Sequence, residues 1–155
     1  MSRRLRINPD PCTGCLNCMA ACMQHLSGCA DSQTTGIRVI LNPFTGIQLF
    51  YHCRQCVDAA CAAGCPVSAI RRDSAADPWR IDSSVCIQCG RCVKNCPYQA
   101  VQWSTIYGPV KCDLCDGDPE CVKACHFGVL HFETPDAIIP MGIPEYDLDQ
   151  NLGKT

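Results

Sequence analysis

Four cysteines between residues 86 and 97 have a spacing that suits metal ligation. They are Cys86, Cys89, Cys92 and Cys96, and Pro97 closes the run. Thiolates at C-x2-C-x2-C-x3-C-P spacing are typical ligands of iron-sulfur clusters, three for one cluster and the fourth for a second. A zinc knuckle also uses C-x2-C pairs, but zinc needs four ligands and no third cysteine at this spacing. We therefore favour iron-sulfur ligation, and such a run requires a partner run.

The local backbone explains this spacing. The first three thiols of the run are expected on a tight loop, in which Gly90 permits an unusual backbone angle close to the metal. Cys92 and Cys96 lie one helical turn apart, so both thiols can face inward while they bind different clusters. Pro97 disfavours helix at Cys96 and is expected to end that turn.

Three further four-cysteine runs repeat this pattern with variations. The first run keeps the spacing but has Met23 in place of the proline, and the second ends in Cys65-Pro66. In the fourth run five residues separate the second and third thiols, and His126 replaces the proline. Their cysteines are Cys12, Cys15, Cys18 and Cys22, then Cys53, Cys56, Cys61 and Cys65, and finally Cys112, Cys115, Cys121 and Cys125.

The composition predicts a fold that depends on metal. The chain has 155 residues, room for one ordinary domain or two very small ones, and 17 of them are cysteine. Aromatic residues make up only 6%, and much of the 47% hydrophobic fraction is cysteine. A core built from the remaining apolar side chains would be thin, so metal ligation has to supply folding free energy.

Charge and hydropathy restrict the compartment and the partners. No apolar signal-peptide segment follows the basic start, and no window approaches the roughly 18 apolar residues of a membrane span. We expect a cytoplasmic protein with no membrane insertion of its own, and export with a signal-bearing partner stays open. The formal charge is −2 before any cluster is counted, and bound clusters would make the protein more acidic. This argues against nucleic acid as a partner.

Short strands are expected between and after the runs. β-Rich stretches around a Pro/Gly turn predict a hairpin of Ile37–Leu41 with Ile47–Tyr51, which should carry much of the small apolar core. A second hairpin is expected around Asp77-Pro78. An apolar segment follows each of the last three runs, which indicates an internal repeat of run plus strand: Val67–Ile70, Ala100–Trp103 and Val129–Phe132.

Some residues stand outside this pattern. Cys29 is the seventeenth thiol and has no run to join, so a buried or incidental free thiol is favoured over a ligand. The four histidines are interpreted as packing groups or as hydrogen-bond donors around the clusters: His25, His52, His126 and His131. Beyond Glu133 prolines alternate with apolar residues, which fits either a frayed terminus or an extended arm on a partner.

The four runs resemble the four-cluster ferredoxin-like electron-transfer subunits of molybdenum and tungsten oxidoreductases and of some hydrogenases. The resemblance covers Cys12 to about Phe132 and includes His52-Cys53-x-x-Cys56, Cys65-Pro66-x-x-Ala69 and Lys111-Cys112-x-x-Cys115. In its short length the chain is most similar to the small iron-sulfur subunits of tungsten-containing aldehyde oxidoreductases.

The resemblance implies an α+β fold, a tandem, nested bacterial-ferredoxin-like arrangement of short helices and hairpins around four 4Fe-4S cubane clusters. It implies a domain over residues 1–132, with an inner two-cluster unit at about 53–103 and an outer unit from 1–30 and 104–132, followed by an arm at 133–155. The implied ligands are Cys12, Cys15, Cys18 and Cys125 for cluster 1, Cys22, Cys112, Cys115 and Cys121 for cluster 2, Cys53, Cys56, Cys61 and Cys96 for cluster 3, and Cys65, Cys86, Cys89 and Cys92 for cluster 4.

The resemblance also implies a non-catalytic role. The chain would carry electrons between a catalytic molybdenum or tungsten subunit and a donor or acceptor, which could be another subunit or a soluble ferredoxin. Copies of the chain could also associate into a longer series of clusters. The alternatives are a free-standing polyferredoxin, a hydrogenase-associated subunit, and a metal-binding structural module. Acidic residues around the fourth run, such as Asp116 and Asp118, predict that cluster 2 has the lowest potential.

Overall fold

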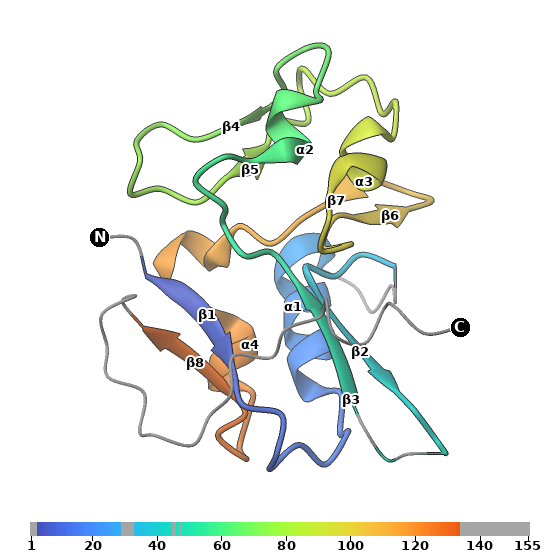
Figure 1. The fold of residues 1–155 in the computed structure, drawn as a ribbon, viewed down its shortest axis with the longest axis vertical. Coiled ribbons are helices and arrows are strands. Elements are labelled where there is room, and N and C mark those ends of the chain that lie inside the picture. Colours follow the sequence, from blue (N-terminus) through green and yellow to red (C-terminus); the bar gives the residue numbers. More distant parts are fainter. Residues whose placement is uncertain (1–2, 29–32, 45, 47, 134–155) are drawn as a thin grey trace.

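The computed structural model describes residues 3–28, 33–44, 46 and 48–133, and it divides into two lobes (Figure 1). The terminal lobe contains α1 (Asn17–Ser27), α4 (Glu120–Lys123) and the strands β1 (Arg4–Ile7), β2 (Ile37–Leu41), β3 (Gln48–His52) and β8 (Leu130–Glu133). The central lobe contains α2 (Ala60–Ala63), α3 (Arg91–Asn95), β4 (Ile70–Arg71), β5 (Arg80–Ile81), β6 (Gln102–Ser104) and β7 (Gly108–Val110). The short helix η1 (Leu114–Gly117) lies where the lobes meet.

All the strands pair as two-stranded antiparallel ribbons. The predicted hairpins are confirmed: β2 pairs with β3, and β4 pairs with β5. The strand β1 was not expected from the sequence, and it pairs with β8 so that Leu5 lies opposite Phe132. The chain therefore begins in the terminal lobe, crosses to the central lobe after β3, and returns after β7 (Figure 1).

Two of the helices agree with the proline rule inferred from the sequence, whereas α4 ends at Lys123 although His126 replaces the proline of its run. Gly90, with φ of 72°, precedes α3, and Cys96 is already extended, so the helix ends just before Pro97 as predicted. In the first run no proline stops the helix after Cys22, and α1 continues for 11 residues. It ends at Gly28, whose left-handed backbone caps the last turn.

Two small cores stabilise the lobes, and cysteine belongs to both. In the terminal lobe Ile37, Val39 and Phe50 of the first hairpin pack with Leu5 and Leu130, which fits the expectation for that hairpin. The core cluster of the central lobe has few buried members: Ala59, Ile70, Val101, Cys61 and Cys92. The thin apolar content expected from the composition is therefore visible in the packing.

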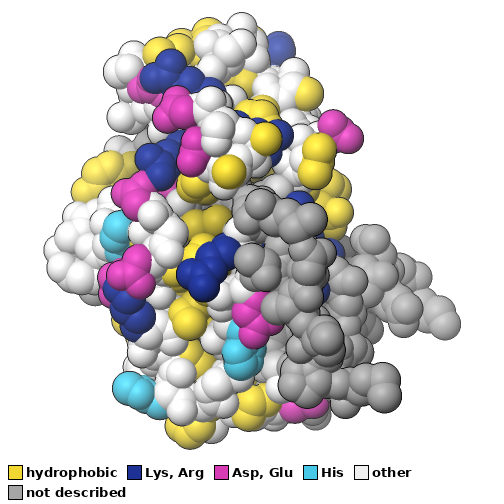
Figure 2. All heavy atoms as spheres, turned by 90° about the vertical axis from the view of Figure 1, so that its left-hand side faces the viewer, with side chains coloured by type: hydrophobic (Ala, Val, Ile, Leu, Met, Phe, Trp, Pro, Cys, Tyr) yellow, Lys and Arg dark blue, Asp and Glu magenta, His cyan; other side chains and the backbone are white. Residues whose placement is uncertain are grey.

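The surface carries interspersed charges. Figure 2 shows basic and acidic side chains next to each other on the face viewed, and the ion pairs of the structure include Arg71–Asp82 and Arg80–Asp116. Within residues 3–28, 33–44, 46 and 48–133, no helix is long and apolar enough to cross a bilayer. Cys29 and the proposed arm from Thr134 onward lie outside the described residues.

Candidate metal centres

All sixteen predicted ligand cysteines lie in the described part of the chain, and none of them forms a disulfide there. They occupy tight turns and the first helical turn that follows each turn. The residue just before the second thiol of every run has a positive φ: Gly14, Gln55, Gln88 and Leu114. Non-glycine residues pay of order 1–2 kcal/mol for this conformation, so three of the four turns carry local strain.

The same repetition appears after the last thiol of three runs. Ser68, Gln99 and Gly128 each stand three residues after that cysteine, and each has a positive φ. The first run is the exception because α1 continues through His25. The sequence showed the repeat of cysteines, but not this repeat of backbone conformation, because polar and apolar side chains occupy the left-handed positions.

These turns direct backbone N–H groups at sulfur. The amides of Ala69 and Ala100 each donate to the thiol four residues earlier at 3.3 Å, and the two sites are equivalent in the repeat. Gln55 and Leu114 donate to the thiol two residues earlier, at 3.5 and 3.4 Å. Gly36 lies outside every run and donates to Cys22 Sγ at 3.1 Å. Such N–H···S bonds stabilise thiolates and influence the potential of a bound cluster.

Burial keeps several of these thiols protonated unless a metal binds. Removal from water raises the pKa of Cys18 and of Cys92 to about 11, and that of Cys121 to about 12. The pKa of Cys112 is raised well above its ordinary value for the same reason. A buried thiol without metal is therefore neutral at pH 7, and iron binding has to displace its proton.

Thiols from distant runs lie near one another. The groups that affect the ionisation of Cys18 include Cys125 as well as Cys12 and Cys15 of its own run. Cys121 and Cys115 both interact with Cys22. In the central lobe, Cys61 interacts with Cys53 and Cys96. The first run thus meets the fourth run, and the second meets the third.

Further interactions join these groups end to end. Cys121 interacts with Cys18, and Cys112 interacts with Cys53 across the junction of the lobes. In the central lobe Cys92 interacts with Cys61. The thiols therefore form a continuous series from one lobe to the other. Cys15 and Cys89 are the exposed members among the sixteen.

A single zinc ion and an iron-sulfur cluster require different spacings of their thiol ligands. Tetrahedral zinc with Zn–S bonds of about 2.3 Å brings its sulfur ligands to about 3.8 Å from each other. Among the described residues, His25, Asp113 and Cys115 are the one group of three whose ligand atoms lie within 4.8 Å of one another, and only one is a cysteine. Within the described residues, no three cysteine thiols therefore meet this criterion for a single metal ion.

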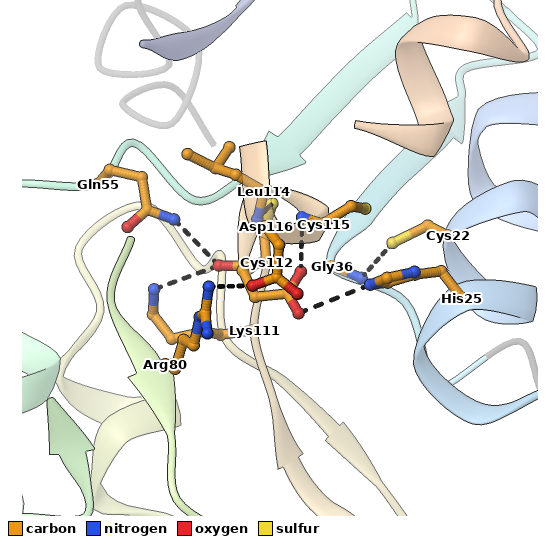
Figure 3. A network of polar contacts seen from close by, with 11 residues as sticks. Cys22, His25, Gly36, Gln55, Arg80, Lys111, Cys112, Leu114, Cys115 and Asp116 are labelled. Carbon is orange, nitrogen blue, oxygen red and sulfur yellow. Dashed lines mark hydrogen bonds and ion pairs between the residues drawn. The ribbon is translucent and has the colours of Figure 1, made fainter. Parts of the chain in front are cut away.

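Two histidines adjoin predicted ligands without replacing them. His25 Nε2 lies 3.7 Å from Asp113 Oδ2, beside Cys115 (Figure 3). Burial lowers the pKa of His52 to about 4, so its imidazole is neutral at pH 7, and its Nδ1 has no hydrogen-bond partner among the described residues. The interpretation of the histidines as packing groups or hydrogen-bond donors around the clusters stays a prediction.

Charges around the fourth run are more balanced than the sequence indicated. Asp116 pairs with Arg80, which comes from the central lobe (Figure 3). Asp118 and Glu120 both pair with Lys123. The low potential predicted for cluster 2 stays a prediction, with a smaller effect expected, because salt-bridged carboxylates oppose reduction less than unpaired ones.

Comparisons with known proteins agree with this arrangement. Residues 51–100 match the family described as 4Fe-4S dicluster domain. The polyferredoxin-like subunit of the aliphatic sulfonate oxidoreductase of Pyrococcus furiosus is 36% identical, over 77% of this chain and 69% of that subunit. The electron transport protein HydN of Escherichia coli K12 is 32% identical, over 81% of this chain and 84% of HydN.

This chain belongs to the family of 4Fe-4S electron-transfer proteins and subunits. The chain is also 33% identical to the beta subunit of the NADH-dependent phenylglyoxylate dehydrogenase of Aromatoleum evansii, over 89% of its own length. It spans only 32% of the length of that subunit. The predicted electron-transfer role and the resemblance to iron-sulfur electron-transfer subunits of oxidoreductases are thereby confirmed.

A solved structure shares the fold. The BamBC complex of benzoyl coenzyme A reductase with zinc aligns with a TM-score of 0.52 and 23% identity, over 90% of this 4Fe-4S protein and 82% of the matched chain. Short helices and strand hairpins in a ferredoxin-like arrangement are therefore common to both.

Proposed function

We propose that the protein is an electron-transfer subunit with four 4Fe-4S clusters, held in a nested tandem ferredoxin-like fold by four sets of thiolates. The outer unit (1–30 and 104–132) would hold clusters 1 and 2, and the inner unit (53–103) would hold clusters 3 and 4. The ligand sets are Cys12, Cys15, Cys18 and Cys125; Cys22, Cys112, Cys115 and Cys121; Cys53, Cys56, Cys61 and Cys96; and Cys65, Cys86, Cys89 and Cys92.

The continuous series of thiols is the observation that carries this proposal. Interactions of Cys18 with Cys121, of Cys112 with Cys53, and of Cys61 with Cys92 link neighbouring sets in the order 1, 2, 3, 4. Exposed Cys15 and Cys89 then belong to the two terminal sets. A linear series with an accessible ligand at each end suits transfer between two partners.

The chain itself supplies ligation, insulation and electrostatic control. Bound 4Fe-4S clusters would supply one-electron transfer. Buried Cys22, Cys61, Cys92, Cys112 and Cys121 keep the interior of the series out of water. Backbone amides at Ala69, Ala100 and Gly36 donate to ligand sulfur and favour the more negative, reduced state.

The partners follow from the relatives. Because relatives are subunits of oxidoreductases, we propose a catalytic subunit at one end, containing molybdenum or tungsten, and an electron donor or acceptor at the other. The proposed arm at 133–155 would bind a partner chain, and self-association would extend the series. A reducing compartment such as the cytoplasm suits sixteen thiols that form no disulfides in the described part of the chain.

Metal analysis tests the cluster count. Anaerobically prepared protein should contain about sixteen irons and about sixteen acid-labile sulfides per chain. The variant Cys29→Ser is the matched control and should keep all of them. A value well under twelve irons in intact protein would exclude the four-cluster proposal.

Single-ligand variants test the nested pairing. Cys12→Ser and Cys125→Ser lie in different runs but should alter the same paramagnetic resonance signal, since they belong to one set. Cys65→Ser should instead alter the signal changed by Cys86→Ser. If Cys12→Ser and Cys125→Ser altered different signals, or Cys65→Ser and Cys86→Ser did, the nested pairing would be wrong.

A further inference from the structure

Lys111 is a buried cation at the junction of the two lobes. Its side chain is 5% exposed, and it stands between β7 and Cys112. Its Nζ donates to Cys53 Sγ at 3.0 Å, to the Trp79 carbonyl at 3.0 Å and to the Cys112 carbonyl at 3.5 Å. An ammonium has three N–H donors and no acceptor, so these contacts satisfy the group completely.

Neighbouring polar groups fix this position. Gln55, itself buried, donates from Nε2 to the Cys112 carbonyl at 3.0 Å and accepts from the Trp79 amide at 2.8 Å. Figure 3 shows Gln55 and Lys111 converging on the same carbonyl oxygen of Cys112. The closed network leaves the ammonium little freedom to turn away from Cys53.

The charge of Lys111 is directed at one thiol set. No ion pair of the described residues includes Lys111, so no carboxylate within the described chain neutralises it. Burial raises the pKa of the Cys56 and Cys61 thiols, and the Lys111 charge opposes that rise at both. With Cys53, three members of the proposed cluster 3 set therefore interact with this cation.

We propose that Lys111, although it lies in the fourth cysteine run, raises the reduction potential of the cluster held by Cys53, Cys56, Cys61 and Cys96. The inference rests on the proposed ligand sets. Reduction adds one electron from the donor and takes a cluster with four thiolates from a charge of about −2 to about −3. A buried cation in contact with ligand sulfur stabilises the more negative state.

The position of cluster 3 in the series gives its raised reduction potential a role in electron transfer. Cys53 interacts with Cys112 across the lobe junction, so the cluster 3 set adjoins the cluster 2 set. Raising the potential at this point favours passage of an electron from the outer pair into the inner pair. Lys111 is therefore not a ligand. It holds a positive charge next to a ligand sulfur of this cluster.

Redox titration of Lys111 variants tests the proposal. In anaerobic holoprotein, reduced stepwise with dithionite and mediators, Lys111→Met should lower the reduction equilibrium constant of one cluster by about tenfold or more, as loss of a charged hydrogen bond predicts. The other signals should stay in place. Lys111→Arg, which keeps the positive charge, should leave the reduction potential of that cluster close to its value in the unsubstituted protein. The matched control is Lys123→Met, which removes an exposed cation of the same run and should leave that cluster unchanged.

The shift should also persist at high salt, because a buried contact is screened little. Lys111→Gln keeps an N–H donor without the charge, so it covers the case in which the apolar variant assembles poorly, and it should reproduce the shift. An unchanged potential in Lys111→Gln, or an equal shift of all clusters, would overturn the proposal. Loss of iron in the Met, Gln and Arg variants alike would show that Lys111 has a structural role, and this result would also overturn the proposal. The iron content of the unsubstituted protein tests the cluster count separately.

Discussion

At the scale of single residues, Gly36 is a site outside the cysteine runs that controls a ligand. Its amide donates to Cys22 Sγ at 3.1 Å, and a Cβ at this position would lie 2.8 Å from Cys112 Cα and 2.9 Å from Cys112 N. Those atoms are backbone and cannot rotate aside. The glycine therefore lets its own segment approach Cys112 closely while its amide contacts Cys22, and both cysteines belong to the proposed cluster 2 set.

We predict that Gly36→Ala displaces Cys112 and weakens cluster 2. Overpacking of this kind costs about 1–3 kcal/mol. Iron content should fall by about four per chain, the content of one cubane cluster, or the corresponding resonance signal should broaden while the inner clusters keep theirs. Gly46→Ala is the control for backbone strain without a clash, because Gly46 has a φ of 69° that disfavours alanine, but its Cβ would meet no atom within 4 Å. Equal effects of the two variants would contradict a role for close packing at Gly36.

At the scale of elements, the pairing of β1 with β8 joins the two ends of the described chain. Leu5 is 6% exposed and lies in the same core as Ile37 and Leu130. The strand β1 also precedes the first cysteine run, and β8 follows the last. Their ribbon therefore closes the terminal lobe around both runs.

We predict that Leu5→Ala destabilises the terminal lobe by about 2–4 kcal/mol, through the cavity it leaves. During anaerobic denaturant unfolding, the signals assigned to clusters 1 and 2 should disappear at lower denaturant than in the unsubstituted protein. The signals of the central lobe should shift less. Val57→Ala, at a side chain that is 67% exposed, should change neither midpoint. If Leu5→Ala left every transition in place, β1 would not stabilise the lobe.

At the scale of the whole molecule, the cores are small and shared with the ligands. Cys22, Cys112 and Cys121 are among the buried members of the terminal core, and Cys61 and Cys92 are among those of the central core. Each of these thiols is packed in the interior of its lobe. The packing that the clusters and their thiolates provide therefore cannot be replaced by the remaining side chains.

We predict that removal of iron by anaerobic chelation abolishes the tertiary structure of both lobes. Metal-ligand bonds supply folding free energy in small metal-dependent domains, so near-ultraviolet dichroism should disappear together with iron. Acid should act in the same direction, because protons compete with iron for the thiolates, among them Cys18 and Cys121, whose pKa values burial raises. An iron-free chain that kept its near-ultraviolet spectrum would contradict this account.

The sequence by itself determined the metal chemistry and the end of α3. Ligand spacing and the effect of Gly90 and Pro97 act over a few residues, so the end of α3 at Asn95 could be predicted before the fold was known. The two hairpins were predictable for the same reason, since strand propensity and turn residues adjoin in the chain. The strand β1 was missed because its partner β8 lies at the other end of the described residues.

Only the tertiary structure decided which charges and thiols meet. In the sequence Lys111 adjoins the acidic fourth run, but in the structure its ammonium contacts Cys53 of the second run. Asp116 lies within the fourth run in the sequence, but in the structure it forms an ion pair with Arg80 of the central lobe. These contacts span many residues and depend on how the two lobes pack, and no short-range pattern records that packing.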